Sequence, residues 1–207
     1  MSVGVGPWAG EFPAGDFYDP ELLANGDSRN VEDRFRYWTV SAIQSQLDRE
    51  RQNGPQLWVA IENYQHDFNI GSIVRTANAF NAARIYVVGH KRWNRRGAMV
   101  TDRYLHITHC ETVAEFAGEC GDLPIIGIDN FDGSIPLETY SFPRDCVLVF
   151  GQESTGLSPE MQAICSTILH ITQYGSTRSI NVGAAGAIAM FEWSRQRRGE
   201  LPSVEEP

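Results

Sequence analysis

The stretch that decides the fold reads GSTRSINV at residues 175–182 and continues as the small, apolar run GAAGAIAM at residues 183–190. Polar side chains at Ser179 and Asn181 separate an apolar strand, predicted at 168–172, from a helix whose small residues allow close packing. The N-terminus of such a helix presents free backbone N–H groups and the positive end of its dipole. The sequence therefore predicts a site for a polar ligand or an anion at this junction.

A similar junction occurs upstream, where residues 69–80 read NIGSIVRTANAF. Asn69 is a favourable N-cap for a helix, and Arg75 lies about 1.7 helical turns further on. Apolar residues cover most of this helix, which indicates burial. We therefore expect the Arg75 guanidinium to need a partner, either a carboxylate or a phosphate.

A third junction lies at residues 147–160, which read VLVFGQESTGLSPE. Ser158 and Pro159 are typical of a helix start after a glycine-containing loop. No Gly-Lys-Ser/Thr follows, so the loop is not a phosphate-binding P-loop. Glu153 comes just after a buried strand, where ligands bind in α/β sheets. Three such junctions predict one composite active site.

From residue 57 onward, short apolar runs alternate with helical stretches. Strands are expected at 57–62, 84–88, 105–108, 125–129, 147–150 and 168–172, and helices at 70–80, 112–119, 159–165 and 182–198. Near-continuous apolar strands that alternate with helices indicate an α/β fold, with a mostly parallel sheet flanked by helices.

The domain organisation follows from this alternation. Residues 1–56 are expected to be an acidic N-terminal arm plus a helix, with 1–30 extended and 31–51 helical. Residues 57–194 would form the catalytic domain, and residues 195–207 a polar C-terminal tail. A chain of 207 residues can bury the core of such a domain without disulfides.

Charge is unevenly distributed along the chain. The net charge of −9 argues superficially against a nucleic-acid partner. However, residues 1–33 contain seven acidic residues against one arginine, whereas residues 90–104 contain five basic residues and one acidic residue. Because the local field matters more than the net charge, this basic loop is compatible either with nucleic-acid binding or with a solvated surface.

Other function classes find little support in the sequence. The four cysteines have no metal-ligand spacing, which favours reduced thiols of a cytoplasmic protein. His106 and His109 lie three apart on an expected strand and would face opposite sides, so we expect no metal site. We expect no membrane span, because no apolar run approaches about 20 residues. A dehydrogenase is disfavoured because no GxGxxG follows the first strand.

Taken together, the three junctions resemble the SpoU/TrmH family of RNA ribose 2′-O-methyltransferases, within the SPOUT superfamily. The resemblance covers residues 57–193 and rests on NxGxxxR, GxExxGLS and SxNV in this order. The matching residues are Asn69, Arg75, Gly151, Glu153, Gly156, Leu157, Ser179, Asn181 and Val182. Ile180 stands where Leu is usual and Gly183 replaces a common Ser, and neither change removes a functional group.

The resemblance implies a trefoil knot in the C-terminal part of the domain, in which the chain between Gly151 and Ser179 threads a loop. S-adenosylmethionine would bind in the knot and leave as S-adenosylhomocysteine, with no metal required. The implied cofactor-binding residues are Ile126, Gly127, Gly151, Ile171, Ser179 and Asn181. Members of the family are homodimers, and the apolar helix at 182–198 is a plausible dimer face.

The resemblance also implies roles in catalysis. The implied catalytic residues are Arg75, Asn69, Glu153, Ser179 and Asn181. In the family Arg75 would be the base that accepts the 2′-hydroxyl proton, although arginine normally stays protonated in proteins. An alternative makes it a phosphate clamp that orients the ribose.

RNA binding would involve the basic loop as well as Arg75. The expected RNA-binding residues there are Lys91, Arg92, Trp93, Arg95 and Arg96, with Trp93 stacking on a base. The substrate is expected to be tRNA rather than rRNA, because no separate RNA-binding domain is recognisable in residues 1–56. Two alternatives stay open: a SPOUT base methyltransferase, and a non-catalytic RNA-binding dimer of the same fold.

Overall fold

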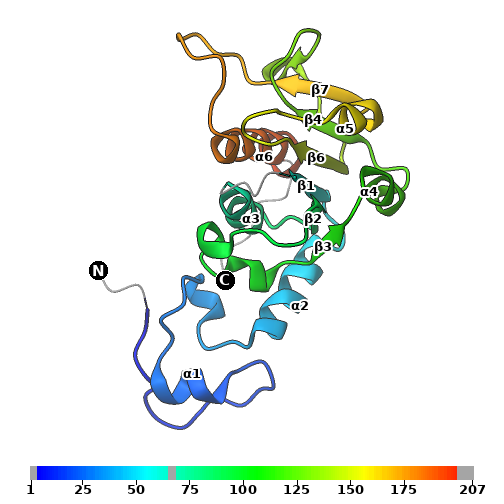
Figure 1. Ribbon diagram of the computed structural model, residues 1–207. Helices are drawn as coiled ribbons and strands as arrows, with labels where there is room; N and C mark the ends of the chain where they lie inside the picture. The colour runs from blue at the N-terminus through cyan, green and yellow to red at the C-terminus, as the bar shows by residue number, and fades with distance from the viewer. Residues whose placement is uncertain (1–3, 65–68, 200–207) are drawn as a thin grey trace. The chain divides into compact units, whose positions relative to one another are not determined.

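The computed structural model describes residues 4–64 and 69–199, which divide into two compact units with the boundary along the chain between Gln52 and Asn53. The larger unit contains a seven-stranded, all-parallel sheet with strand order β3-β2-β1-β6-β4-β7-β5 (Figure 1). Its strands are β1 (Leu57–Asn63), β2 (Arg84–Gly89), β3 (Ile107–Cys110), β4 (Ile125–Ile128), β5 (Ile135–Pro136), β6 (Cys146–Phe150) and β7 (Thr167–His170). The predicted fold class, a parallel α/β sheet flanked by helices, is confirmed.

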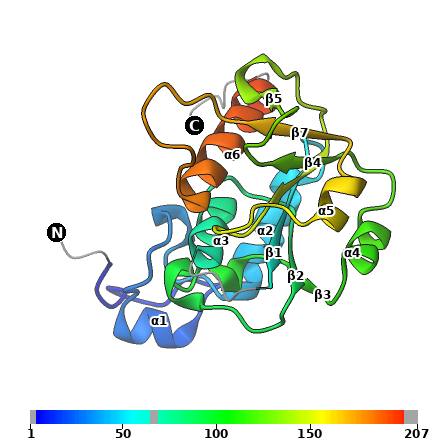
Figure 2. The same cartoon turned by 45° about the horizontal axis from the view of Figure 1, so that its top comes forward.

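Helices cover both faces of this sheet. They are α3 (Ile70–Ala79), α4 (Val113–Cys120), α5 (Pro159–Ile164) and α6 (Val182–Arg198), with 3-10 segments η2 (Arg95–Ala98), η3 (Thr101–Tyr104) and η4 (Leu137–Thr139). Helices α3 and α6 pack together on one face, and Figures 1 and 2 both show them side by side.

The two faces are built from alternating residues of the same strands. In β6, Leu148 and Phe150 belong to the core under α3 and α6, whereas Val147 and Val149 belong to the core beside α4 and α5. Side chains of a strand alternate between faces, so burial on both faces requires an uninterrupted apolar run. All five residues of β6 are buried, which explains the continuous run CVLVF.

One predicted strand begins later than expected, and one strand of the structure was not predicted. Strand β3 begins at Ile107, not Leu105, because η3 occupies the chain up to Tyr104. His106 therefore precedes the strand, and the expected alternation of His106 and His109 across one strand was wrong. Strand β5 was not expected, since two residues carry no periodicity.

The smaller unit contains α1 (Pro20–Asn25), η1 (Asp33–Phe35) and α2 (Val40–Arg51). The expectation of an extended arm over residues 1–30 was wrong at Pro20–Asn25, which form α1. Asp19 caps α1 by accepting from the amides of Glu21 and Leu22 at 2.9 and 3.4 Å, and Pro20 follows at the first helical position. The signal was therefore present as Asp-Pro before an apolar pair.

The expected continuous helix over 31–51 was also wrong. It is interrupted at Tyr37, whose φ is +63°, and α2 begins only after Thr39, which caps it by accepting from the Ala42 amide at 3.2 Å. The Tyr37 amide donates instead to the buried carboxylate of Asp27 at 2.9 Å. A tertiary hydrogen bond to a charged acceptor here replaces a helical one.

The outer boundaries of the domains stay predictions. The helix α6 continues to Arg198, so residues 195–198 of the expected polar tail are helical. Residues 200–207 of that tail lie outside the described residues.

Candidate active site

The three polar junctions meet at one hydrogen-bonded cluster of Asn69, Glu153 and Asn181. Asn69 Nδ2 donates to Glu153 Oε2 at 2.7 Å, and Asn181 Nδ2 donates to Asn69 Oδ1 at 2.8 Å. Asn181 Nδ2 also lies 3.5 Å from Glu153 Oε1. Residues separated by 84 and 112 positions in sequence are thereby joined, as a composite site requires.

The helix-start role of Asn69 differs from expectation. The side chain of Asn69 does not cap α3, because its amide is committed to Glu153 and its oxygen to Asn181. Asn181 is the residue that caps a helix: its Oδ1 accepts from the amides of Gly183 and Ala184 at 2.9 and 3.3 Å, at the start of α6. The side-chain oxygen of Asn181 therefore caps α6, and its side-chain nitrogen donates to the cluster.

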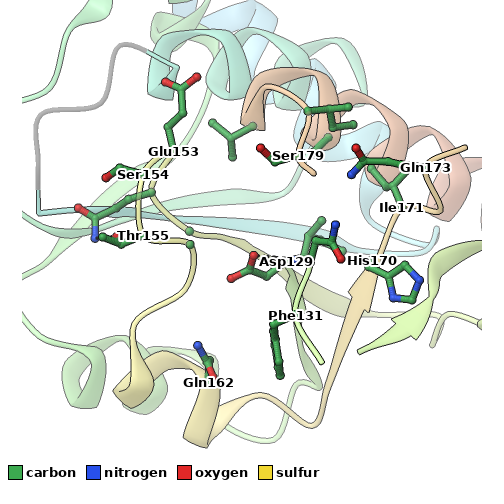
Figure 3. A pocket seen from close by; sticks show the side chains of 18 residues that line it. Asp129, Phe131, Glu153, Ser154, Thr155, Gln162, His170, Ile171, Gln173 and Ser179 are labelled. Carbon is green, nitrogen blue, oxygen red and sulfur yellow. Dashed lines mark hydrogen bonds between the residues drawn. The ribbon is translucent and has the colours of Figure 1, made fainter. Parts of the chain in front are cut away.

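Beside this cluster lies a cavity of about 360 Å³ at the carboxyl ends of β4, β6 and β7. In Figure 3, Asp129 lies between the loop that carries Glu153, Ser154 and Thr155 and the segment that carries His170. The volume lies in the range of cofactor and small-molecule sites. This edge of a parallel sheet is also where such ligands bind.

The loop that lines the cavity requires its two glycines. A Cβ on Gly151 would lie 2.2 Å from the carbonyl carbon of Gly156, because the loop folds back on itself. Gly156 has φ +66°, and a Cβ there would lie 2.3 Å from Asp129 Oδ2. Gln152 and Gly156 exchange two backbone hydrogen bonds, of 3.0 and 2.9 Å, across this turn. The tip of the turn exposes Glu153 beside the cavity.

The cavity has a negative electrostatic character. Asp129 and Glu153 both line it, and none of the described residues that line it is a lysine or an arginine. Such a site favours a cationic ligand and disfavours a dinucleotide or nucleotide phosphate. A sulfonium cofactor with an ammonium group fits this charge, and the cavity walls also offer the amide side chains of Gln162 and Gln173.

Four of the six expected cofactor-binding residues lie in the cavity wall or in the neighbouring cluster. Gly151, Ile171 and Ser179 line the cavity. Asn181 does not line it and belongs to the neighbouring cluster.

Ile126 and Gly127 are not among the lining residues, and their expected role in cofactor binding stays a prediction. Both are buried inside β4: Ile126 is part of the core under α3 and α6, and Leu157 Cδ1 would lie 2.7 Å from a Cβ on Gly127. The lining of this strand begins one residue later, at Ile128.

Arg75 lies on the exposed side of α3. The expectation of burial was wrong for this side chain. Within residues 4–64 and 69–199, Arg75 has no hydrogen bond or ion pair with another side chain. Its guanidinium is therefore available to a ligand outside the fold.

The basic loop is fixed to the same helix. A Cβ on Gly71 would lie 2.7 Å from the Ala98 amide nitrogen, so the first turn of α3 and η2 pack backbone against backbone. Lys91, Arg92, Arg95 and Arg96 are exposed. This contact holds the basic loop next to the helix that carries Arg75.

Trp93 of the basic loop is less exposed than its basic neighbours. Trp93 is partly buried against the core, with the Arg95 guanidinium 5.6 Å from the centre of its ring. Arg95 also lies 3.4 Å from Asp102 Oδ2. The expected stacking of Trp93 on a base stays a prediction.

Two carboxylates at this edge of the sheet were not expected, Asp129 and Glu62. Each directly follows or ends a buried apolar strand run, which is the signal that singled out Glu153. Glu62 is fully buried, and its pKa is raised by burial even though Ser158 donates two hydrogen bonds to it. Burial of a carboxylate costs free energy, so such a group calls for a structural or functional reason.

Among the described residues, no group of three or more His, Cys, Asp or Glu side chains could hold a metal ion. In the same part of the chain, no helix is long and apolar enough to cross a bilayer.

Comparison with known proteins assigns the chain to a family. Residues 56–191 match the model of the SpoU rRNA Methylase family. Relatives include the 23S rRNA (guanosine-2′-O-)-methyltransferase RlmB of Acinetobacter baylyi, 26% identical over 74% of the chain, and the tRNA (guanosine(18)-2′-O)-methyltransferase of Escherichia coli, 26% identical over 70%. The chain covers 65% of the length of each of these two relatives.

Solved structures of similar fold agree. The A. aeolicus TrmH/SpoU tRNA modifying enzyme has a TM-score of 0.64 at 25% identity, over 76% of this chain and 85% of its own. The SpoU methyltransferase AviRb from Streptomyces viridochromogenes, in complex with AdoMet, has a TM-score of 0.63 at 27% identity, over 74% of this chain and 65% of its own.

Proposed function

Because the chain belongs to the SpoU rRNA methylase family, we propose that it transfers a methyl group from S-adenosylmethionine to a ribose 2′-hydroxyl of RNA. The observation that carries the proposal is the Asn69–Glu153–Asn181 cluster, which joins an acidic cavity to the helix that bears Arg75. The RNA ribose methyltransferases among its relatives support the same reaction.

The reaction requires alignment of the donor and the acceptor in line. When bound, S-adenosylmethionine would supply an activated methyl group on its sulfonium sulfur, with the neutral thioether S-adenosylhomocysteine as the leaving group. Asp129 and Glu153 would stabilise a cationic ligand in the cavity, and Gly151, Ile171 and Ser179 would contact it. Asn69 and Asn181 would hold Glu153 in one orientation beside it.

The exposed Arg75 would act on the RNA side. We favour the phosphate clamp over the base, because an exposed guanidinium stays charged and binds phosphate in a bidentate manner. The 2′-hydroxyl proton would then leave to water. Exposed Lys91, Arg92, Arg95 and Arg96 would contact further phosphates.

The remaining parts of the proposal concern assembly and substrate. A homodimer is supported by Ile188 and Phe191, which leave 40% and 57% of their surface exposed on α6. We further propose a tRNA substrate, a cytoplasmic location and the trefoil knot between Gly151 and Ser179, all of which stay predictions. Analytical ultracentrifugation tests the dimer: a monomer at all concentrations would contradict it.

The decisive experiment is methylation of RNA from a strain that lacks the gene. Purified protein and radiolabelled S-adenosylmethionine are incubated separately with total tRNA and with rRNA, and the RNA is hydrolysed with alkali. Label in an alkali-resistant dinucleotide is expected, since a 2′-O-methyl group blocks cleavage of the neighbouring phosphodiester. Label on a base would indicate a base methyltransferase, and RNA binding without cofactor binding would indicate a non-catalytic protein.

A further inference from the structure

Two buried or half-buried carboxylates hold consecutive amides at the base of the cavity loop. Glu62, at the carboxyl end of β1, accepts from the Ser158 amide at 2.8 Å and from Ser158 Oγ at 2.6 Å. Asp129, which follows β4, accepts from the Leu157 amide at 2.8 Å. The turn at 151–156 is thus closed by its own backbone and fixed at its far end by two different strands.

The arrangement of Glu62 has no simple structural explanation. The side chain is 0% exposed, and no ion pair to it is present among the described residues. The nearby charges that act on it, Asp129 and Glu160, are of the same sign. Helix α5 already has its cap in Ser158 Oγ, which accepts from the Met161 amide at 3.1 Å. Within the described part of the chain, Glu62 is therefore a buried carboxylate without an ion pair, and both hydrogen bonds that its side chain accepts come from residue 158.

The loop that it fixes carries both parts of the site. Residues 151–156 line the cavity, and Glu153 at the tip bonds to Asn69. A displacement of the loop base would change the cavity wall and the cluster together, whereas the basic loop packs against α3 and makes no hydrogen bond to this loop within the described residues.

We propose that Glu62 is a positioning residue that, together with the Asp129 carboxylate that also lines the cavity, fixes the loop at 151–158, so that the cavity and the Asn69–Glu153–Asn181 cluster are assembled before any ligand binds. The role rests on the proposed function, because the consequence is preorganisation for cofactor binding and methyl transfer. Neither carboxylate needs to touch the transferred methyl group.

The test uses the full chain and four variants: Glu62→Ala, Glu62→Gln, Asp129→Asn and Ser158→Ala. Glu160→Gln is the matched control, since it removes a negative charge that acts on Glu62 from an exposed side chain. The first readout is amide hydrogen exchange of Leu157 and Ser158 by NMR, which needs neither cofactor nor RNA. The others are calorimetric affinity for S-adenosylhomocysteine, RNA affinity, and kcat and KM for methylation.

For Glu62→Ala we expect exchange at Leu157 and Ser158 to accelerate about tenfold, with a similar loss of S-adenosylhomocysteine affinity. The kcat falls as well, RNA affinity is unchanged, and Glu62→Gln restores part of each effect because one acceptor oxygen remains. Asp129→Asn acts in the same direction at Leu157. Glu160→Gln behaves as wild type.

Unchanged exchange in the Glu62 variants would overturn the proposal, and so would faster exchange with wild-type cofactor affinity and kcat. If Glu62→Ala does not fold, Ser158→Ala and Glu62→Gln decide by the same readouts. Failure of the wild-type protein to bind S-adenosylhomocysteine or to methylate RNA would instead contradict the proposed function, while the exchange data would still report whether the carboxylates fix the loop.

Discussion

The cavity and the basic loop adjoin the same cluster but have opposite charge. The cavity is lined by Asp129 and Glu153, with no lysine or arginine among the described lining residues. The basic loop at 90–104 has five basic residues and one acidic residue, and it packs on α3, which begins one residue after Asn69. The net charge of −9 is that of the whole chain and does not show that these two regions differ in sign.

This difference would allow the proposed site to accept two ligands of opposite charge. A cationic cofactor is favoured on the acidic side, and a polyanionic RNA on the basic side. Asn69 and Glu153 come from the two sides and meet at 2.7 Å, so the cluster marks where the methyl donor and acceptor are expected to meet.

The largest expected effect is that of Arg75→Ala on the basic side. Loss of the guanidinium should lower the methylation rate by about a thousandfold, because it removes substrate orientation at the reacting ribose. Single-turnover methylation measures the rate, and S-adenosylhomocysteine affinity should not change. In Arg75→Lys, a clamp keeps a measurable rate with the wild-type pH profile, whereas a shifted profile would favour the base.

On the cavity side, Glu153→Gln should lower kcat by about a hundredfold, since it disturbs the cluster without removing volume. It should also reduce the preference for the cationic S-adenosylmethionine over the neutral product by about fivefold, because one of two carboxylates is lost. Calorimetry with both ligands gives this ratio. An unchanged ratio would mean that the acidic character of the cavity does not select the cofactor.

A smaller effect is expected from Arg96→Ala in the basic loop. RNA affinity should fall by about tenfold at low salt, and the slope of log affinity against log salt should decrease by about one. Arg95→Ala should have less effect on the slope, because Arg95 already lies near Asp102. Filter binding at several salt concentrations measures both. Equal loss of cofactor affinity would contradict the division of the site into two sides.

The smallest effect on activity is expected in the smaller unit. Burial alone would raise the pKa of Asp27, but hydrogen bonds from the Arg29 side chain and the Tyr37 and Arg29 amides, with the Arg29 charge, lower it to about 2 from 3.8. A lowered pKa means that the carboxylate stabilises the fold above about pH 4 and that this is lost as pH falls towards 2.

Asp27→Asn should therefore cost about 2 kcal/mol of stability at pH 7 and less at pH 2.5. Urea unfolding followed by tryptophan fluorescence measures this difference, with Asp33→Asn as control, because the Asp33 side chain is 94% exposed. A constant cost at both pH values would show that the charge of Asp27 does not stabilise the unit. Methylation at pH 7 by folded protein should be unaffected.

Much of this protein follows from local sequence. The run CVLVF at 146–150 is continuous because both faces of β6 are buried, and that pattern predicts a parallel sheet wherever it alternates with helices. Local sequence also predicts the three junctions, since each places polar residues after an apolar strand. Local periodicity carries this information because it reflects burial of the segment itself.

Only the tertiary structure decided which residues meet. The strand order brings β4, β6 and β7 together, so Asp129 lies in the cavity, whereas Ile126 and Gly127 are buried beneath Leu157 and the helices. The Tyr37 amide donates its hydrogen bond to the Asp27 carboxylate, whereas in a continuous helix it would donate to a backbone carbonyl. Pairings such as Asn69 with Glu153, 84 positions apart, leave no trace in local periodicity, because they depend on where whole strands end in space.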